Sequence, residues 1–504
     1  MSHSALLLLL SLSTVQDAAP EPAPEPAPEP APEPAPDAAP ERRGVVHRDE
    51  RAFDGYTLIS PLRSTTAYLL DMDGEVVHSW PNEHKPGNSV YLLDDGTLLR
   101  CGRDEDNPVF HGGGQGGYVQ RLAPDGELLW DLDLSDEERM AHHDIEPLPN
   151  GNVLVVTWES KTREEALQAG RDPELLPEEG GFWPDVVLEL KPQPPHGAEV
   201  VWEWHAWDHL VQDVAPDRDN FGVVWLLPGK IDLNGDRGVE ELSEEQMERL
   251  RAMGYAGDSP PQTGGRGGRQ DWLHTNSIDY NAALDQIVLS VHRFNELWVI
   301  DHGTTTEEAA GPQGDLLYRW GNPRAYGCGE LPDQRFFSQH DAQWIEPGCP
   351  GAGDLLVFNN GRNRFDGAYS SVDVLRPPVD EDGRYPVARR QAWGPEELSW
   401  RYASPEPADF YSDFISGAQR LPNGNTLICS GAQARIFEVT PDGEVVWDFL
   451  STYGGETGDA DGRPAGPPPG RPGPDGGGPP ERPAGGLREG RPDGPGGPGG
   501  PGGP

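Results

Sequence analysis

The sequence has little cysteine, little positive charge and no long apolar run. Cysteine occupies only 4 of its 504 positions, which excludes a scaffold built on disulfides. There are 39 lysines and arginines against 85 aspartates and glutamates, giving a net charge of -46. Nucleic acids and anionic membranes bind basic patches, so this balance argues against both as the main partner.

The most apolar run covers residues 5–12. A bilayer needs about 20 apolar residues to span it, so we expect no transmembrane anchor. The run is typical of the centre of a secretory signal, which predicts a signal peptide over residues 1–19 and export to the periplasm or the cell exterior. A leucine-rich start on a cytosolic protein stays the alternative, because no basic residue precedes the run.

Glycine and proline are abundant, with 64 and 54 residues, and their excess belongs largely to the two ends and to the turns. A Pro-Glu-Pro-Ala repeat makes residues 20–44 an extended linker, since proline at every second position removes backbone donors. Residues 451–504 are rich in Gly, Pro, Arg and Asp and predict a disordered tail. The 15 tryptophans indicate a folded core between these ends.

Two short phrases recur between residues 45 and 450. One is a small turn, then two or three β-branched or leucine residues, then an aromatic. Its six copies end at Trp80, Trp130, Trp204, Trp320, Tyr402 and Phe449. The other is a hairpin turn, clearest at Asn150-Gly151 and Asn423-Gly424, because both residue types tolerate positive φ. Weaker forms of the hairpin centre on Gly55, Gly96, Gly351 and residues 281–286.

Six units of four strands predict an all-β fold: a six-bladed β-propeller over residues 45–450, with long loop insertions and disordered Pro/Gly-rich ends. The insertions fall chiefly at 205–270, and also at 158–182 and 321–338. Two unrelated β-sandwiches stay the alternative fold.

The first strand of a propeller blade lines the central channel, and three of the predicted first strands open with histidine. These are His143, His274 and His340, which are expected to converge on the axis. Imidazole serves as a metal ligand, a general base or a nucleophile near neutral pH. Because side chains alternate along a strand, the neighbouring Asp144 and Asp341 are expected on the opposite face, as structural partners.

Four segments carry a more specific signal: Gly-Tyr-Thr-Leu at 55–58, His-His-Asp-Ile at 142–145, Asp-Trp-Leu-His-Thr-Asn-Ser at 271–277 and Gln-His-Asp-Ala at 339–342. Together they resemble the bacterial arylsulfate sulfotransferase (arylsulfotransferase, ASST) family. The resemblance implies a propeller that moves a sulfuryl group from an aryl sulfate donor to a phenolic acceptor, without the nucleotide PAPS and with no required cofactor. It also implies a covalent sulfohistidine at His340, with His143 and His274 holding the sulfate oxygens.

One position departs from the family pattern. By its spacing from His274, the family's catalytic arginine falls at His292, and Arg293 is the next residue. A shift of one residue in a strand turns a side chain to the other face. Either a bulge brings Arg293 into the site, or His292 replaces the arginine as a weaker, pH-dependent donor.

A possible ligand set for calcium lies in the insertion. Asp232, Asn234 and Asp236 resemble the start of a calcium loop, although Arg237 stands at its glycine position and Ser243 at its glutamate position. An acidic surface loop leading into a helix at 243–253 is the alternative.

The remaining cysteines and arginines give weaker signals. Cys328 and Cys349 flank His340 and are candidates for a disulfide, but four cysteines allow three pairings. Cys101 and Cys429 are expected to be small buried residues. Two arginines after the His340 hairpin, Arg362 and Arg364, lie on a turn from which they would reach a bound anion, or which is simply solvated.

Three functions remain open from the sequence. The first is sulfuryl transfer through His340. The second is a catalytically lapsed propeller that binds an anionic ligand or a protein. The third is a metal-dependent hydrolase with a three-histidine site. The sequence does not predict the oligomeric state.

Overall fold

The computed structural model describes residues 43–177, 180–237 and 270–453. The predicted signal peptide, all but the last two residues of the predicted linker, the helix expected at 243–253 and the predicted tail from 454 onward lie outside the described residues. Export and the disordered ends therefore stay predictions. No helix within the described ranges is long and apolar enough to cross a membrane.

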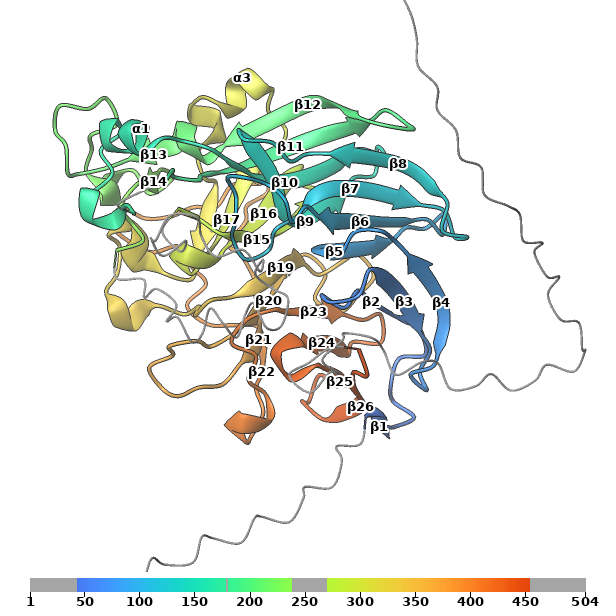
Figure 1. Cartoon of the computed structure of the whole chain (residues 1–504). Coiled ribbons are helices and arrows are strands. Elements are labelled where there is room, and N and C mark those ends of the chain that lie inside the picture. The colour runs from blue at the N-terminus through green and yellow to red at the C-terminus, as the bar shows by residue number, and fades with distance from the viewer. Residues whose placement is uncertain (1–42, 178–179, 238–269, 454–504) are drawn as a thin grey trace, which may run out of the picture. The chain divides into compact units, whose positions relative to one another are not determined.

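Apart from two short strands in an insertion, the strands of the described chain form six antiparallel sheets arranged as the blades of a propeller (Figure 1). Blade 1 has β2 (Thr57–Ile59), β3 (Thr66–Leu70) and β4 (Val76–Pro81), and blade 2 has β5 (Pro86–Leu92), β6 (Leu98–Arg103), β7 (Gly117–Leu122) and β8 (Leu128–Asp133). Blade 3 has β9 (Arg139–Pro147), β10 (Val153–Glu159), β11 (Asp185–Pro192) and β12 (Ala198–His205), and blade 4 has β15 (Thr275–Asn281), β16 (Gln286–Val291), β17 (Glu296–Asp301) and β18 (Tyr318–Trp320). Blade 5 has β19 (His340–Trp344), β20 (Leu355–Asn359), β21 (Ser371–Leu375) and β22 (Trp400–Tyr402), and blade 6 has β23 (Ser416–Arg420), β24 (Thr426–Ser430), β25 (Arg435–Val439) and β26 (Val445–Leu450). The prediction of an all-β, six-bladed propeller is confirmed, and two sandwiches are excluded.

Two details of the prediction are wrong. Four strands were expected in every unit, but blade 1 has three, because no strand pairs with β2 across the hairpin turn expected at Gly55. The chain's first strand, β1 (Gly44–Arg48), pairs instead with β26, so blade 6 has five strands. An antiparallel partner for the otherwise exposed edge of β26 satisfies its backbone groups, and it ties the start of the described chain to its end.

The insertions carry short elements. The 158–182 loop contains α1 (Arg163–Gln168), whose first turn is closed by a capping box between Thr162 and Glu165. The described part of the 205–270 insertion has two short parallel strands, β13 (Leu210–Val211) and β14 (Ile231–Asp232). A further short helix, α3 (Thr306–Ala309), lies between β17 and β18.

The recurring aromatic phrase forms the outermost predicted strand of each blade, and its tryptophans join neighbouring blades. In five units of the described chain, the indole N–H donates to a backbone carbonyl in the turn before the last strand of the next blade. The pairs are Trp130 with Gly197 (2.7 Å), Trp204 with Gly314 (2.8 Å), Trp320 with Pro395 (2.9 Å), Trp400 with Pro441 (2.8 Å) and Trp447 with Met72 (3.0 Å). The repeat therefore encodes contacts between blades as well as strands.

The first test concerns these indole bonds, because Trp80 offers a matched control. Trp80 and Trp130 are each 2% exposed, but Trp80 Nε1 has no hydrogen-bond partner among the residues that the structure describes. Replacing Trp130 with phenylalanine is expected to lower the free energy of unfolding by about 1 kcal/mol more than Trp80→Phe, the usual net value of one hydrogen bond. Denaturant unfolding of both variants measures the difference. Equal losses would mean that the indole bond contributes nothing.

Around the channel, buried carboxyl groups join the inner strands. Asp144 on β9 accepts the Ile278 N–H of blade 4 (3.1 Å), and Asp341 on β19 accepts the Ala418 N–H of blade 6 (2.6 Å). Asp279 on β15 accepts the Trp344 N–H of blade 5 in the same way (2.6 Å). The expected structural role of Asp144 and Asp341 fits these bonds.

The expected strict alternation along these strands is wrong, because both strands are irregular where the histidines lie. Asp144 and His143 line one cavity, and so do Asp341 and His340. Each pairing register shifts at this point, and φ is 53° at His143 and 52° at Asp341.

These inter-blade carboxyl groups predict how stability depends on pH. Burial raises the pKa of Asp144 and of Asp279 to about 7, and that of Asp341 to about 6. Unfolded aspartate titrates near about 4, so the folded state binds these protons more tightly, and the free energy of unfolding falls as pH rises through the folded pKa values. We expect a higher melting temperature near pH 5 than near pH 8. In Asp144→Asn this drop becomes smaller, and an unchanged drop would contradict the assignment.

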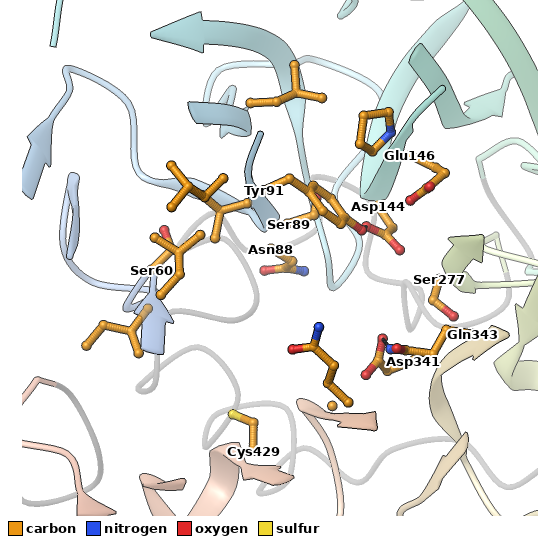
Figure 2. Close-up of a pocket in the computed structure, with 18 of the residues that line it drawn as sticks. Ser60, Asn88, Ser89, Tyr91, Asp144, Glu146, Ser277, Asp341, Gln343 and Cys429 are labelled. Atoms are coloured by element: carbon orange, nitrogen blue, oxygen red, sulfur yellow. Dashed lines mark hydrogen bonds between the residues drawn. The ribbon is translucent and has the colours of Figure 1, made fainter. Parts of the chain in front are cut away.

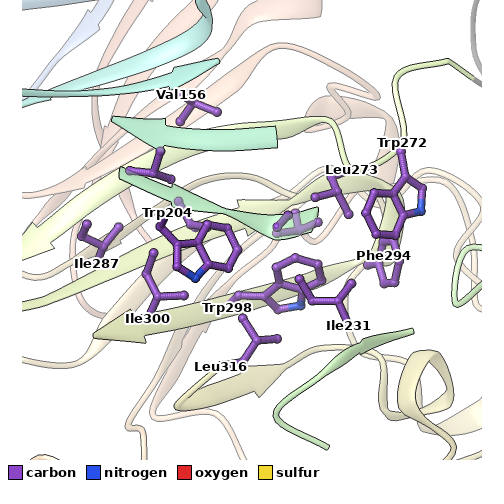
Figure 3. Close-up of a cluster of buried hydrophobic side chains, with 14 of the residues drawn as sticks. Val156, Trp204, Ile231, Trp272, Leu273, Ile287, Phe294, Trp298, Ile300 and Leu316 are labelled. Carbon is purple, nitrogen blue, oxygen red and sulfur yellow. The ribbon is translucent and has the colours of Figure 1, made fainter. Parts of the chain in front are cut away.

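A large buried cluster between blades 3 and 4 positions His274, one of the candidate site residues. Trp204 on β12, Trp298 on β17 and Ile231 of the insertion pack around Trp272 and Leu273 (Figure 3). These last two residues come directly before His274, so burial of their side chains holds the histidine at the inner end of β15.

Candidate active site

Four histidines from three blades meet at one end of the channel. Their rings follow one another, with ring centroids 4.4 Å apart for His143 and His274, 4.9 Å for His274 and His292, and 5.4 Å for His292 and His340. His292 opens the 3-10 helix η4 (His292–Phe294), which turns the chain between β16 and β17. The structure thus brings together all the histidines that the sequence singled out.

The backbone around the cluster is strained and tightly fitted. His143 and His274 have φ of 53° and 52°, a region that non-glycine residues seldom adopt and that is common at functional sites. Gly114, with φ of 76°, passes so close that a Cβ there would lie 2.1 Å from His143 Nε2. Only glycine fits at this position beside the imidazole.

The two ring nitrogens of His340 differ: Nδ1 is hydrogen-bonded, and Nε2 has no partner among the described residues. Its Nδ1 lies 2.8 Å from Asn360 Oδ1, while the Asn360 amide nitrogen donates to Ser412 O (2.7 Å) and Ser416 Oγ (3.0 Å). These two donations orient the amide so that its oxygen faces His340, which places the proton on Nδ1 and a lone pair on Nε2. Within the described chain, His340 Nε2 is buried and has no hydrogen-bond partner.

His274 is held by a buried carboxylate. Its Nδ1 pairs closely with Asp271, whose other oxygen accepts the Trp158 indole N–H at 3.0 Å. Burial acts to raise the pKa of Asp271, but His274 and then Arg293 outweigh it, and the net pKa lies below its usual value. Asp271 is therefore an ionised partner that fixes the ring of His274.

The other rings are neutral at pH 7. Burial, and then the neighbouring histidines, lower the pKa of His143 and of His292 well below the usual value. Burial also lowers the pKa of His340 to about 4, against the opposing effect of its bond to Asn360. Neutral imidazole is the nucleophilic form, so positive charge at this site has to come from other residues.

Two arginines act on the cluster electrostatically. The charge of Arg293 contributes to lowering the pKa of His292, and that of Arg362 does so for both His292 and His340. Residues 292–294 form a helical turn in place of the expected strand, so the alternation that set His292 against Arg293 does not apply: the ring of His292 joins the cluster while Arg293 contributes charge. Entry of Arg293 into the site and replacement of the family's arginine by His292 both stay predictions.

Arg362 and Arg364 have different surroundings. Arg362 lies two residues after Asn360, and its charge acts on His292 and His340. For this residue, contact with a bound anion and a solvated turn both stay predictions. Arg364 instead donates to Ser371 Oγ at 2.5 Å and stacks on Tyr369. Sequence reasoning also gave no role to Asn360, Asp271 or Asp185. Asp271 lies three residues before His274, so its own segment held the signal, whereas Asn360 and Asp185 lie in other segments than the histidines that they meet.

The cluster adjoins a channel cavity of 1660 Å³. His143, His340 and Asn276 line one part of it, and the carboxyl groups of Asp144 and Asp341 lie on its wall (Figure 2). A cavity of this size would take a phenolic ester.

The cysteines differ from expectation. Cys429 also lines this cavity and is exposed there, so the expectation that it is buried is wrong, whereas Cys101 is buried as expected. All four cysteines are free. Cys328 and Cys349 pack against different hydrophobic clusters and form no disulfide.

The calcium-like loop uses its side chains in internal bonds. The Asp236 carboxylate pairs with Arg171 at 2.5 and 2.7 Å, and Asn234 accepts the Asp172 N–H and donates to Gly170 O. Asp232 accepts the Asn234 N–H, as in an ordinary turn. These bonds account for the three residues without an ion. In the described ranges, no group of three or more His, Cys, Asp or Glu is placed to hold a metal, so the geometry does not favour a three-histidine metal site.

The fold and this cluster define a β-propeller protein with a buried, histidine-lined site at the end of its channel. The model of the arylsulfotransferase (ASST) family matches residues 49–448. The chain belongs to this family, which supports arylsulfotransferase-type activity in general terms, with an aryl sulfate as donor and a phenol as acceptor.

Three solved structures show distant similarity to this chain. A protein of unknown function from Bacteroides caccae is 12% identical, with a TM-score of 0.42, and the match covers 79% of this chain and 95% of that one. A streptogramin B lyase is 10% identical, with a TM-score of 0.36 and coverages of 81% and 83%. The Cps50 (Swd1) β-propeller domain of Myceliophteria thermophila is 10% identical, with a TM-score of 0.36 and coverages of 81% and 90%. No curated protein matches the sequence.

Proposed function

We propose that this protein transfers a sulfuryl group from an aryl sulfate to a phenol through a sulfohistidine at His340, without PAPS. One observation carries the proposal: His340 Nδ1 is fixed by Asn360, while Nε2 is buried at the cavity without a hydrogen-bond partner. A buried polar atom of this kind calls for an explanation, and a nucleophile waiting for substrate supplies one.

The reaction runs in two displacements. In the first, His340 Nε2 attacks the sulfur, an N–S bond forms and the aryl O–S bond breaks, releasing an aryloxide. In the second, the phenol oxygen attacks the same sulfur, a new O–S bond forms and the N–S bond breaks. Each step is easier than one direct displacement between two phenols in a single complex.

The rest of the cluster stabilises the sulfuryl group in transit. Its three oxygens carry negative charge, which Arg293 and Arg362 balance. His143 and His274 hold these oxygens as hydrogen-bond donors in the states in which Nε2 of the ring carries a proton. In a protein with a net charge of -46, this local positive charge also favours the approach of an anionic ester.

The direct test is the mass of the protein. Incubation with 4-nitrophenyl sulfate alone should add one sulfuryl group to the intact chain, on the peptide that contains His340, and a later addition of phenol should remove it. Release of 4-nitrophenol with no protein adduct at any time would overturn the covalent route.

A catalytically lapsed, anion-binding propeller is the second candidate, because a histidine stands where the family has its arginine. Under this reading, calorimetry would detect binding of 4-nitrophenyl sulfate, and no 4-nitrophenol would be released.

A further inference from the structure

We propose that His142 and Asp185 form a proton relay behind His143, which takes the proton of the phenolic acceptor and returns one to the departing aryloxide. The inference rests on the proposed sulfuryl transfer. Neither residue touches the reacting atoms, so both act through His143.

The first link joins two adjacent histidines. His142 on β9 is fully buried, and its ring lies flat on Trp158, with centroids 4.2 Å apart and planes 12° apart. Its Nδ1 is 2.8 Å from His143 Nδ1. Only one nitrogen of such a pair can donate, so a single proton lies between the two rings.

The second link joins His142 to a carboxylate. Asp185, at the start of β11, is 2% exposed, and its Oδ1 lies 3.4 Å from His142 Nε2. Both of these atoms are buried and lack a hydrogen-bond partner in the described chain. The other oxygen, Asp185 Oδ2, accepts the Thr275 N–H at 2.8 Å, which anchors the carboxylate beside His274. A ring nitrogen that can donate therefore faces a carboxylate oxygen that can accept, and a proton on His142 Nε2 would satisfy both atoms.

The proton positions follow from these contacts. With a proton on His142 Nε2 facing Asp185, His142 Nδ1 becomes an acceptor and His143 Nδ1 the donor. The lone pair of His143 is then on Nε2. His143 lines the same cavity as His340, which puts the residue beside a phenol bound there.

The relay balances the chemistry of both displacements. When the phenol attacks, its O–H bond breaks and the proton goes to His143 Nε2, while the Nδ1 proton of His143 passes to His142. The new positive charge then lies on His142, beside the Asp185 carboxylate. The first displacement starts from this protonated relay: the His143 Nε2 proton goes to the aryloxide oxygen, and the Nδ1 proton of His142 returns to His143 Nδ1. Burial and the neighbouring histidines lower the pKa of His143, so the positive charge is not stable on His143 itself. The Asp185 carboxylate is needed to stabilise that charge on His142.

The test separates a relay from a structural histidine by varying the acidity of the acceptor. In His142→Phe, which keeps a flat ring on Trp158, transfer from sulfated His340 to unsubstituted phenol should fall by about 10²-fold. Transfer to the more acidic 4-nitrophenol should fall much less, and so should the burst from 4-nitrophenyl sulfate, because a stable aryloxide needs no proton. Asp185→Asn should give the same pattern, which keeps the test valid if His142→Phe does not fold.

The chain offers a matched control in His209. It is also fully buried, stacks on Trp204 with planes 6° apart and bonds to Asp315 at 2.9 Å, but it lies outside the histidine cluster. His209→Phe should leave the dependence on acceptor acidity as in wild type. Equal losses for phenol, 4-nitrophenol and the donor burst in both relay variants would overturn the relay. Absence of a sulfuryl adduct in the wild-type protein would instead overturn the proposed function on which the relay rests.

Discussion

The His340→Ala variant is expected to lose the sulfuryl adduct and at least about 10⁴-fold in multiple-turnover transfer. The imidazole of His340 is the nucleophile in both displacements, so its removal leaves no atom to carry the group between donor and acceptor. The remaining arginines and histidines would still bind an aryl sulfate, because they do not depend on His340 for their positions. Intact-protein mass after exposure to 4-nitrophenyl sulfate, together with a phenol-dependent release assay, measures both effects.

His302→Ala serves as the control for this variant. His302 is also largely buried and bonds to two carboxylates, Asp285 at 2.7 Å and Glu189 at 3.1 Å, but it lies outside the cluster. It should keep the adduct and the turnover. An adduct that persists in His340→Ala would place the nucleophile on another residue.

The second large effect is expected at Asn360, which positions His340. In Asn360→Leu the shorter of the two bonds to Nδ1 is lost and only the Ser338 carbonyl at 3.2 Å remains, so the proton is held less firmly on Nδ1 and the ring can turn. A histidine in the wrong tautomer cannot attack, and the first displacement should slow by about 10²-fold or more. Pre-steady-state release of 4-nitrophenol measures this step.

Asn360→Asp separates tautomer control from packing. A carboxylate also accepts the Nδ1 proton, so this variant should recover most of the rate lost in Asn360→Leu. It should also shift the pH profile upward, because a negative neighbour raises the pKa of the imidazole. Equal rates in the two variants, with equal thermal stability, would show that Asn360 serves only to fill space.

The sequence predicted the propeller because its signal is local and repeated. Each copy of the aromatic phrase carries its own turn, strand and tryptophan, so six weak patterns support one another. The same reasoning failed at blade 1, where pairing between Val45 and Phe449 joins residues from opposite ends of the described chain. Edge pairing of that kind depends on which strand is left without a partner once the ring has closed, and no local pattern records it.

The sequence by itself determined the fold and which histidines reach the axis, because both follow from a repeated unit and from the position of a residue within it. Only the tertiary structure decided the state of each histidine. Asn360 beside His340, Asp271 beside His274 and Asp185 behind His142 each fix where a proton lies, and Asp185 reaches its histidine from another strand. Burial and hydrogen bonding set the charge and the tautomer of an imidazole, and both depend on which chain segments the closed ring brings together.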